Sequence, residues 1–171
     1  LNNIMTLERQ QILNRLLVKD RIEKLDKELD KLDIHLSKPF FCVSVLEPDF
    51  PDEIIEALNL DGEEMLSYIM YNVSSEIALE CGCGIVFTDY HGKTVFIAEG
   101  DSAEAVLEKA EQIARKIRFS VQKALGFTVS CGIGKVYCEL SGIPSSFRRA
   151  QKCLDYRFYE RSDFQMTYQE M

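Results

Sequence analysis

The stretch "TVSCGIGK", residues 128–135, is the part of the sequence from which the fold is deduced. It lies within "FTVSCGIGKV", which has the composition of a β-strand and ends in two glycines one residue apart. A phosphate loop of the Walker type needs G-x-x-x-x-G-K-[ST], and "GIGKV" lacks both the spacing and the hydroxyl residue. We therefore interpret Gly132 and Gly134 as the end of a sheet strand where two backbones pass closely.

Helices are predicted on both sides of this strand. On the N-terminal side, Asp101 or Ser102 caps a long helix that runs to about Leu125, and Gly126 ends it. On the C-terminal side, Pro144 and two serines introduce a last helix with an apolar face. The positions on that face are Phe147, Ala150, Leu154 and Phe158.

The preceding half of the chain adds three strands and one long helix. "PFFCVSVLEP", residues 39–48, is an apolar, β-branched run between two prolines, and a loop with a short helix follows it. Asp61 and Glu64 form a D-x-x-E pair that predicts the start of a longer helix. "CGIVFTDYHGKTVFIAEG" is typical of a hairpin whose turn lies at residues 89–92. The resulting order, β-α-β-β-α-β-α, predicts an α+β fold with helices packed on an antiparallel-rich sheet.

Two helices are predicted before the first strand, over residues 4–18 and from about Asp20. The second carries apolar residues spaced by three, four and three positions, as in the seam of a short coiled coil. Such a seam favours either a homodimer or packing on the same chain, and the sequence leaves both open. We divide the chain into residues 1–37, which form linker or dimerisation helices, and residues 38–171, which form the regulatory domain. The seam residues are Ile22, Leu25, Leu29 and Leu32.

Composition narrows the classes of function. The 171 residues include 20 Lys and Arg against 28 Asp and Glu, a net charge of −8, which disfavours direct binding to nucleic acid or anionic membranes. No apolar run approaches the length of a membrane span and no signal peptide is visible, so we expect a cytoplasmic protein with reduced cysteines. Cys81 and Cys83 have no second ligand pair, and we predict no metal site and no cofactor.

The order of elements resembles the nucleotidyl-cyclase and GGDEF type of domain, which has a ferredoxin-like sheet. "TVSCGIG" resembles the late strand of that family. "SSFRRAQKCLDYRFYERSDF" is similar to the segment that follows this strand in the degenerate GGDEF-like domain of YesN-type regulators of the AraC family. The helices in "ILNRLLVKDRIEKLDKELDKLDIHL" resemble those that lead into that domain.

This resemblance implies a non-catalytic signal-relay module of a bacterial transcriptional or response regulator. Its expected partners are a second copy of the chain, an upstream receiver of two-component signalling or a membrane sensor, and DNA through a helix-turn-helix domain that this chain lacks. The basic residues of the last helix would then face the acidic half of a partner subunit, or else water. They are Arg148, Arg149, Lys152, Arg157 and Arg161.

The resemblance also allows catalysis to be considered, and several features argue against it. The turn that carries GG[DE]EF in active diguanylate cyclases reads "TDYHGKT" here, and Asp89 comes too early to substitute. Glu47 and Asp49 echo the metal-binding acids, but Pro48 separates them, and we expect both to face water. Phe158 stands where active relatives place a phosphate-facing lysine.

Charge gives a further argument against nucleotide binding. Residues 39–92 contain no Lys or Arg, and a field of that sign repels a triphosphate. Two alternatives remain: a small-molecule sensor whose acidic cleft takes a cationic or divalent ligand, and a weak cyclase. The acids of this stretch are Glu47, Asp49, Asp52, Glu53, Glu56, Asp61, Glu63, Glu64, Glu76, Glu80 and Asp89.

Overall fold

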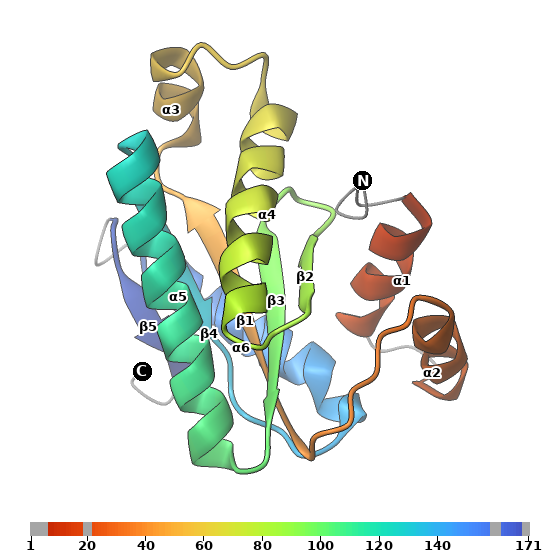
Figure 1. Ribbon diagram of the computed structural model, residues 1–171. Helices are drawn as coiled ribbons and strands as arrows, with labels where there is room; N and C mark the ends of the chain where they lie inside the picture. The colour runs from red at the N-terminus through yellow and green to blue at the C-terminus, as the bar shows by residue number, and fades with distance from the viewer. Residues whose placement is uncertain (1–6, 19–21, 158–161, 169–171) are drawn as a thin grey trace.

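The five-stranded sheet at the centre of the fold confirms the predicted α+β class. The computed structural model describes residues 7–18, 22–157 and 162–168. Its strands lie in the order β2-β3-β1-β4-β5, and every neighbouring pair is antiparallel except β4 and β5 (Figure 1). The strands are β1 (Phe40–Pro48), β2 (Ile85–Thr88), β3 (Thr94–Gly100), β4 (Val129–Ile133) and β5 (Gln165–Thr167).

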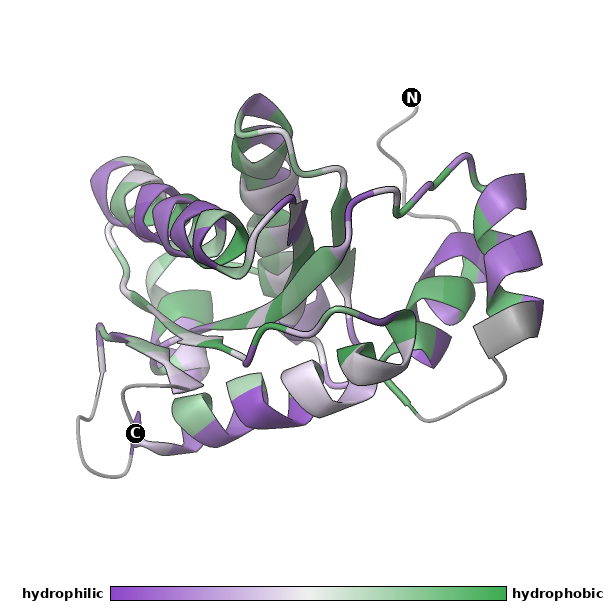
Figure 2. Cartoon of the chain, turned by 90° about the horizontal axis from the view of Figure 1, so that it is seen from below, coloured by the Kyte–Doolittle hydropathy of each residue, from purple (hydrophilic) through white to green (hydrophobic). Residues whose placement is uncertain are grey.

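Helices cover both faces of the sheet. One face carries α4 and α5, and the other carries α6 together with the N-terminal pair α1 and α2 (Figures 1 and 2). The short α3 follows β1, and a 3-10 turn, η1 (Leu140–Gly142), precedes α6. The helices are α1 (Leu7–Leu16), α2 (Ile22–Lys31), α3 (Pro51–Ala57), α4 (Glu63–Glu80), α5 (Ala103–Leu125) and α6 (Ile143–Asp155). No helix within the described residues combines the length and the apolar character needed to cross a bilayer.

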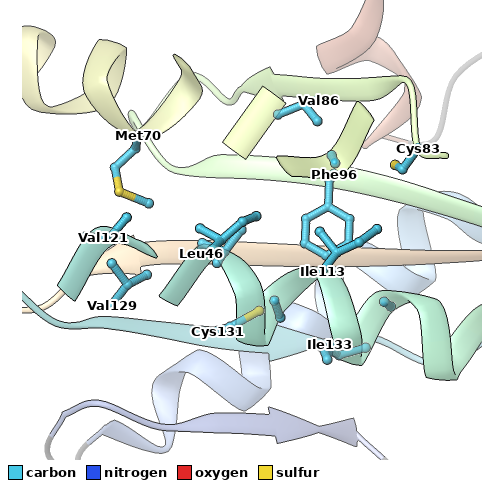
Figure 3. Packing of buried hydrophobic residues seen from close by; sticks show 14 of the residues in the cluster. Leu46, Met70, Cys83, Val86, Phe96, Ile113, Val121, Val129, Cys131 and Ile133 are labelled. Atoms are coloured by element: carbon cyan, nitrogen blue, oxygen red, sulfur yellow. The ribbon is translucent and has the colours of Figure 1, made fainter. Parts of the chain in front are cut away.

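The central strands are apolar on both faces because each face has its own core. In β1, Cys42 and Leu46 belong to the cluster under α4 and α5, whereas Val43 and Val45 belong to the cluster under α6, α1 and α2. Figure 3 shows the first cluster, where Phe96 of β3 meets the side chains of α5. Each fully buried aliphatic or aromatic side chain contributes about 1.5–3 kcal/mol to folding, so the two clusters hold the layers together.

Gly132 and Gly134 bring β4 close to α6, as the sequence predicted. A β-carbon on Gly132 would collide with the carbonyl oxygen of Ala150, and one on Gly134 with that of Ser146. Ser146 also accepts a hydrogen bond from the backbone N–H of Val43 at 2.9 Å, which joins α6 to β1. The glycines therefore serve packing between strand and helix.

Helix ends were predicted with mixed success. Ser102 caps α5 by accepting a hydrogen bond from the N–H of Ala105 at 3.0 Å, and Gly126 ends the helix in the left-handed conformation, as expected. The predicted cap at Asp61 is wrong. Gly62 is the N-cap of α4 and makes no side-chain cap, and Glu63 begins the helix. Acidic residues in the first turn interact with the helix dipole in place of a side-chain cap.

One strand was not predicted, and the first and last predicted helices extend beyond the described residues. β5 was not predicted; it follows α6 and adds a parallel edge to β4. The predicted first helix began at residue 4, but residues 4–6 lie outside the described part, and α1 begins at Leu7. Phe158 likewise lies outside the described residues.

The four seam residues lie on or beside α2. Leu25 and Leu29 are 4% and 3% exposed and pack in the cluster that α1 and the sheet share, so packing on the same chain accounts for their burial. Leu32 is half-buried at the edge of that cluster, and the side chain of Ile22 lies outside the described part. A homodimer through this stripe stays a prediction.

Candidate functional site

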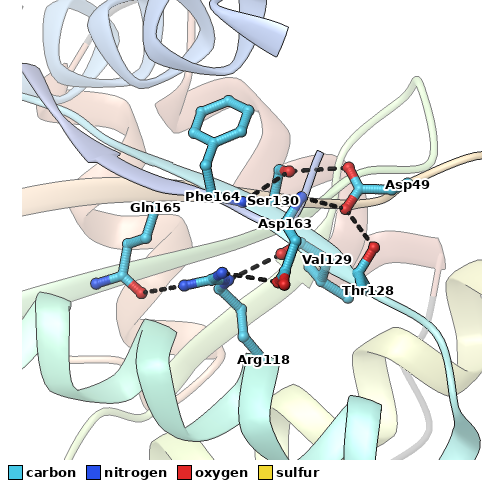
Figure 4. Close-up of polar contacts among 8 residues, drawn as sticks. All are labelled: Asp49, Arg118, Thr128, Val129, Ser130, Asp163, Phe164 and Gln165. Atoms are coloured by element: carbon cyan, nitrogen blue, oxygen red, sulfur yellow. Dashed lines mark hydrogen bonds and ion pairs between the residues drawn. The ribbon is translucent and has the colours of Figure 1, made fainter. Parts of the chain in front are cut away.

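The candidate metal acids lie at the end of β1, where the sheet meets the C-terminal segment. Asp49 is 4% exposed, and its carboxylate accepts hydrogen bonds from Thr128 Oγ1 at 2.7 Å, Ser130 Oγ at 2.8 Å and the N–H of Asp163 at 2.9 Å (Figure 4). The prediction that Asp49 faces water is therefore wrong. The antiparallel register of β1 and β4 sets Glu47 opposite Ser130. Asp49 lies two residues beyond Glu47, and its carboxylate is within reach of the Ser130 hydroxyl.

Glu47 contacts the segment that directly follows α6. Arg157 forms an ion pair with Glu47, and its second terminal nitrogen lies 4.0 Å from Asp49 Oδ1. Partial burial lowers the pKa of Arg157, yet a guanidinium remains protonated at neutral pH. Both acids that resemble metal ligands are thus paired with groups of their own chain.

Arg118 of α5 extends this network to β5. Its Nε donates to the carbonyl of Val129 at 2.8 Å, one terminal nitrogen pairs with Asp163 at 2.9 Å, and the other donates to Gln165 at 3.3 Å (Figure 4). Gln165 in turn donates to the carbonyl of Glu111 at 3.1 Å. One arginine therefore ties α5, β4 and the C-terminal strand together. We call Asp49, Arg118, Thr128, Ser130 and Asp163 the C-terminal network.

The hairpin turn between β2 and β3 is fixed by Asp89. Its Oδ1 accepts hydrogen bonds from the N–H groups of His91 and Lys93, both at 2.9 Å. Gly92 has φ +83°, a left-handed conformation that suits glycine, and its carbonyl accepts from Ser67 of α4 at 2.8 Å. Asp89 is 4% exposed, and its Oδ2 has no hydrogen-bond partner within the described residues.

A pocket of about 580 Å³ opens beside this turn, between α1, the first half of α4 and the hairpin. We call it the turn pocket. It combines three tyrosines with three acids, and no Lys or Arg lines it within the described residues. The tyrosines and acids are Tyr68, Tyr71, Tyr90, Glu63, Glu64 and Asp89.

The described part of the chain offers no grouping of three or more His, Cys, Asp or Glu side chains able to hold a metal ion. Two of the buried cysteines are also poor nucleophiles. Burial raises the pKa of Cys42 to about 12 and that of Cys83 to about 11, so both thiols stay protonated at neutral pH. Cys138 is exposed and Cys81 is half-buried.

Three of the five basic residues predicted for the last helix have contacts within the described part of the chain. Arg148 donates to Ser145 at 2.9 Å, and the guanidinium of Arg149 lies 5.0 Å from the centre of the Tyr168 ring. Arg157 is paired as described above, whereas Arg161 lies outside the described residues. Lys152 is exposed.

Sequence reasoning missed Arg118, Ser130, Asp163 and the turn pocket. The i, i+3 spacing of Tyr68 and Tyr71 places both on one side of α4 and was a usable signal for the pocket. No comparable signal exists for the C-terminal network, because its members come from four separate parts of the chain and meet only when the strands pair and α5 packs on the sheet.

Comparison with known proteins gave one family match. A family model described as GGDEF-like domain matches residues 19–156, which include α2, the strands β1–β4 and all of α6. A search of curated proteins gave no match. The matched range ends before β5, so the family comparison does not cover the strand that Arg118 holds.

Proposed function

The chain belongs to the GGDEF-like domain family, and from this premise we propose that it is a non-catalytic relay module of an AraC-family bacterial regulator. In this proposal the module forms a homodimer and links an input domain, either a receiver or a membrane sensor, to a helix-turn-helix DNA-binding domain. The N-terminal helices receive the input, and the segment after α6 passes it on. The protein carries out no reaction of its own.

The contacts that Glu47 and Asp49 make within the chain are the main support for the absence of catalysis. A cyclase needs carboxylates free to hold Mg²⁺ beside the nucleotide phosphates. Here Glu47 is paired with Arg157, and Asp49 accepts three hydrogen bonds from the C-terminal network. Magnesium held between these two carboxylates would have to compete with these partners. The stretch that holds both acids, residues 39–92, contains no Lys or Arg, and the positive charge that Arg157 brings to them is already paired with Glu47.

The position of the C-terminal network supports the relay part. A relay needs a packing arrangement that both ends of the chain can bias. The N-terminal helices pack on the same face of the sheet as α6, and α6 leads into the segment that Asp49 and Arg118 hold. This placement supports a relay in which a shift of the N-terminal helices reaches α6 through their shared core, and reaches β5 through its contacts with α6.

Incubation with GTP and Mg²⁺ tests the absence of catalysis. We expect no cyclic dinucleotide above the level of a blank without protein. A product that disappears in Glu47→Ala or Asp49→Ala would overturn the proposal. Exposed Asp52→Ala is the matched control, because it removes the same charge from the first turn of α3.

A fusion experiment tests the pairing role. This chain replaces the dimerisation domain of a repressor whose DNA-binding half represses only as a pair. We expect the fusion to restore repression of a reporter gene, and removal of residues 1–37 to reduce it. Repression no better than that of the isolated DNA-binding half would contradict the pairing role.

The turn pocket favours a second candidate function, that of a small-molecule sensor. Its volume, about 580 Å³, lies within the range of ordinary ligand sites, about 300–1,000 Å³. Gln10 of α1 lines it, so an occupant would contact one of the helices that the relay proposal assigns to the input. Binding of a metabolite without turnover is the expected observation for a sensor.

A further inference from the structure

We propose that the turn pocket binds a small organic cation that carries an ammonium group, such as a primary amine or a quaternary ammonium compound. This inference rests on the second candidate function, the sensor. The relay proposal stands without it.

The aromatic walls are the first argument. Tyr68 and Tyr90 both line the pocket and are 55% and 68% exposed, whereas Tyr71 lies at its base and is 8% exposed. The faces of tyrosine rings attract alkylammonium groups, and aromatic side chains around a site with acidic groups are the usual recognition chemistry for them. Packing in the core explains Tyr71, but it does not explain two exposed tyrosines at the same pocket.

The buried carboxylate of Asp89 is the second argument. Oδ1 holds the hairpin turn, but Oδ2 has no hydrogen-bond partner, and Asp89 forms no ion pair within the described residues. A buried acceptor without a partner is unfavourable, and more so when it belongs to a charged group. Asp89 lines the turn pocket, so the positive charge of an ammonium group there would lower the electrostatic cost of burying this carboxylate. Glu63 and Glu64 add charge of the same sign, although interaction with the α4 dipole is a sufficient reason for their positions.

The lining also disfavours the other ligand classes. Phosphates and carboxylates would face three acids without a Lys or Arg among the described lining residues. A divalent metal would need several oxygen ligands gathered together, and the described residues provide no such group of three. An organic cation uses both the rings and the charge.

Occupancy would act on the N-terminal helix. Asn14 of α1 donates to the carbonyl of Thr88 at 3.0 Å, at the strand end that leads into the turn, and Gln10 lines the pocket one helical turn earlier. A ligand held between α1, α4 and the turn would therefore stabilise α1 in its packed position. This gives a bound cation a physical route to the proposed relay.

Isothermal titration of the whole chain with choline and with putrescine tests the proposal. The matched probe is 3,3-dimethylbutanol, which has the shape of choline without its charge. We expect choline or putrescine to bind and the neutral alcohol not to bind. Tyr68→Ala and Tyr90→Ala should each weaken binding about fivefold, the factor that corresponds to about 1 kcal/mol of cation–π attraction.

The controls keep the test independent of folding. Tyr68 and Tyr90 are exposed, so their alanine variants should keep the wild-type circular dichroism spectrum. Phe119→Ala removes another exposed aromatic, on α5 and outside the pocket, and Glu76→Gln removes an acid of α4 that does not line it. Both should bind as the wild type does.

Three results would overturn the proposal. The first is no binding of choline or putrescine up to about 10 mM. The second is an affinity for the neutral alcohol equal to that for choline, and the third is an unchanged affinity for the ammonium probe in both tyrosine variants. Parallel titrations with glucose, citrate and GTP distinguish an error in the proposed ligand class from a failure of the sensor function itself. If one of these compounds binds and neither ammonium probe does, the proposed ligand class is wrong, but the sensor function is retained. If nothing binds, the sensor fails as well, and the reporter fusion alone decides the relay.

Discussion

Replacement of Asp49 by alanine should destabilise the fold more than its position after a strand suggests. The carboxylate accepts three hydrogen bonds, and the side chain is 1% exposed. The variant leaves three donors without their acceptor. They are the hydroxyl of Ser130, the hydroxyl of Thr128 and the N–H of Asp163.

The cost follows from how well water can replace the carboxylate. Ser130 is fully buried, so its unpaired hydroxyl should cost about 1–3 kcal/mol. Thr128 is half-buried and Asp163 is exposed, so their donors can meet water, and each should cost about 0.5–1.5 kcal/mol. The free energy of unfolding should fall by about 2–6 kcal/mol in Asp49→Ala. Asp49→Asn should cost about 1 kcal/mol, because its amide oxygen can accept from Thr128 and Asp163 while its NH₂ donates to Ser130.

Urea denaturation followed by circular dichroism measures these differences. Asp52→Ala is the charge-matched control and should cost no more than about 1 kcal/mol, because it removes only an exposed acid that interacts with the α3 dipole. Hydrogen exchange should show that the amides of residues 162–168 lose protection in Asp49→Ala. Equal stability of Asp49→Ala and Asp52→Ala would refute the reasoning, because it would mean that the buried hydrogen bonds contribute nothing beyond charge.

Three further predictions concern the cores and the thiols. Burial raises the pKa of Cys42 to about 12 and that of Cys83 to about 11 from the usual 9.0, so the unfolded chain releases protons first. Stability is therefore kept below pH 9 and should fall between pH 9 and about 12, measured by urea denaturation; a flat profile would contradict this. Exposed Cys138 should react with a thiol reagent at pH 8 well before buried Cys42 and Cys83, and equal reaction rates of the three thiols would contradict this. Leu25→Asp with Leu29→Asp should cost about 4 kcal/mol or more and lower the melting temperature by about 10 °C without changing the mass in ultracentrifugation at high concentration. A stable, folded monomer would show instead that the stripe packs between subunits.

The sequence predicted the fold because local patterns and burial agree over most of its length. In α5 the apolar residues Val106, Ile113 and Val121 recur in the sequence at helical spacing, and all three are fully buried. The strands of the hairpin were predicted because β-branched runs flank a turn that Asp89 and Gly92 can form. In these cases the local preference and the final environment are the same.

The errors arose where tertiary contacts decide. Asp49 follows Pro48, which is typical of a loop, and its burial depends on donors that β4 and the C-terminal segment supply. The D-x-x-E pattern at Asp61 satisfies the rule for a cap, but the backbone enters α4 through Gly62. β5 is three residues long, and its pairing depends on Arg118, which is far away in the sequence. Periodicity cannot detect any of these.

The parallel pairing of β5 with β4 has a consequence for solubility. Cys131, Gly132 and Ile133 face Gln165, Met166 and Thr167, so a three-residue strand closes one edge of a sheet whose adjacent strand is entirely buried. An open edge of apolar sequence is a template for strands of other molecules. By holding the segment that contains β5, the guanidinium of Arg118 and the carboxylate of Asp49 should therefore also lower the tendency of β4 to pair with strands of other molecules.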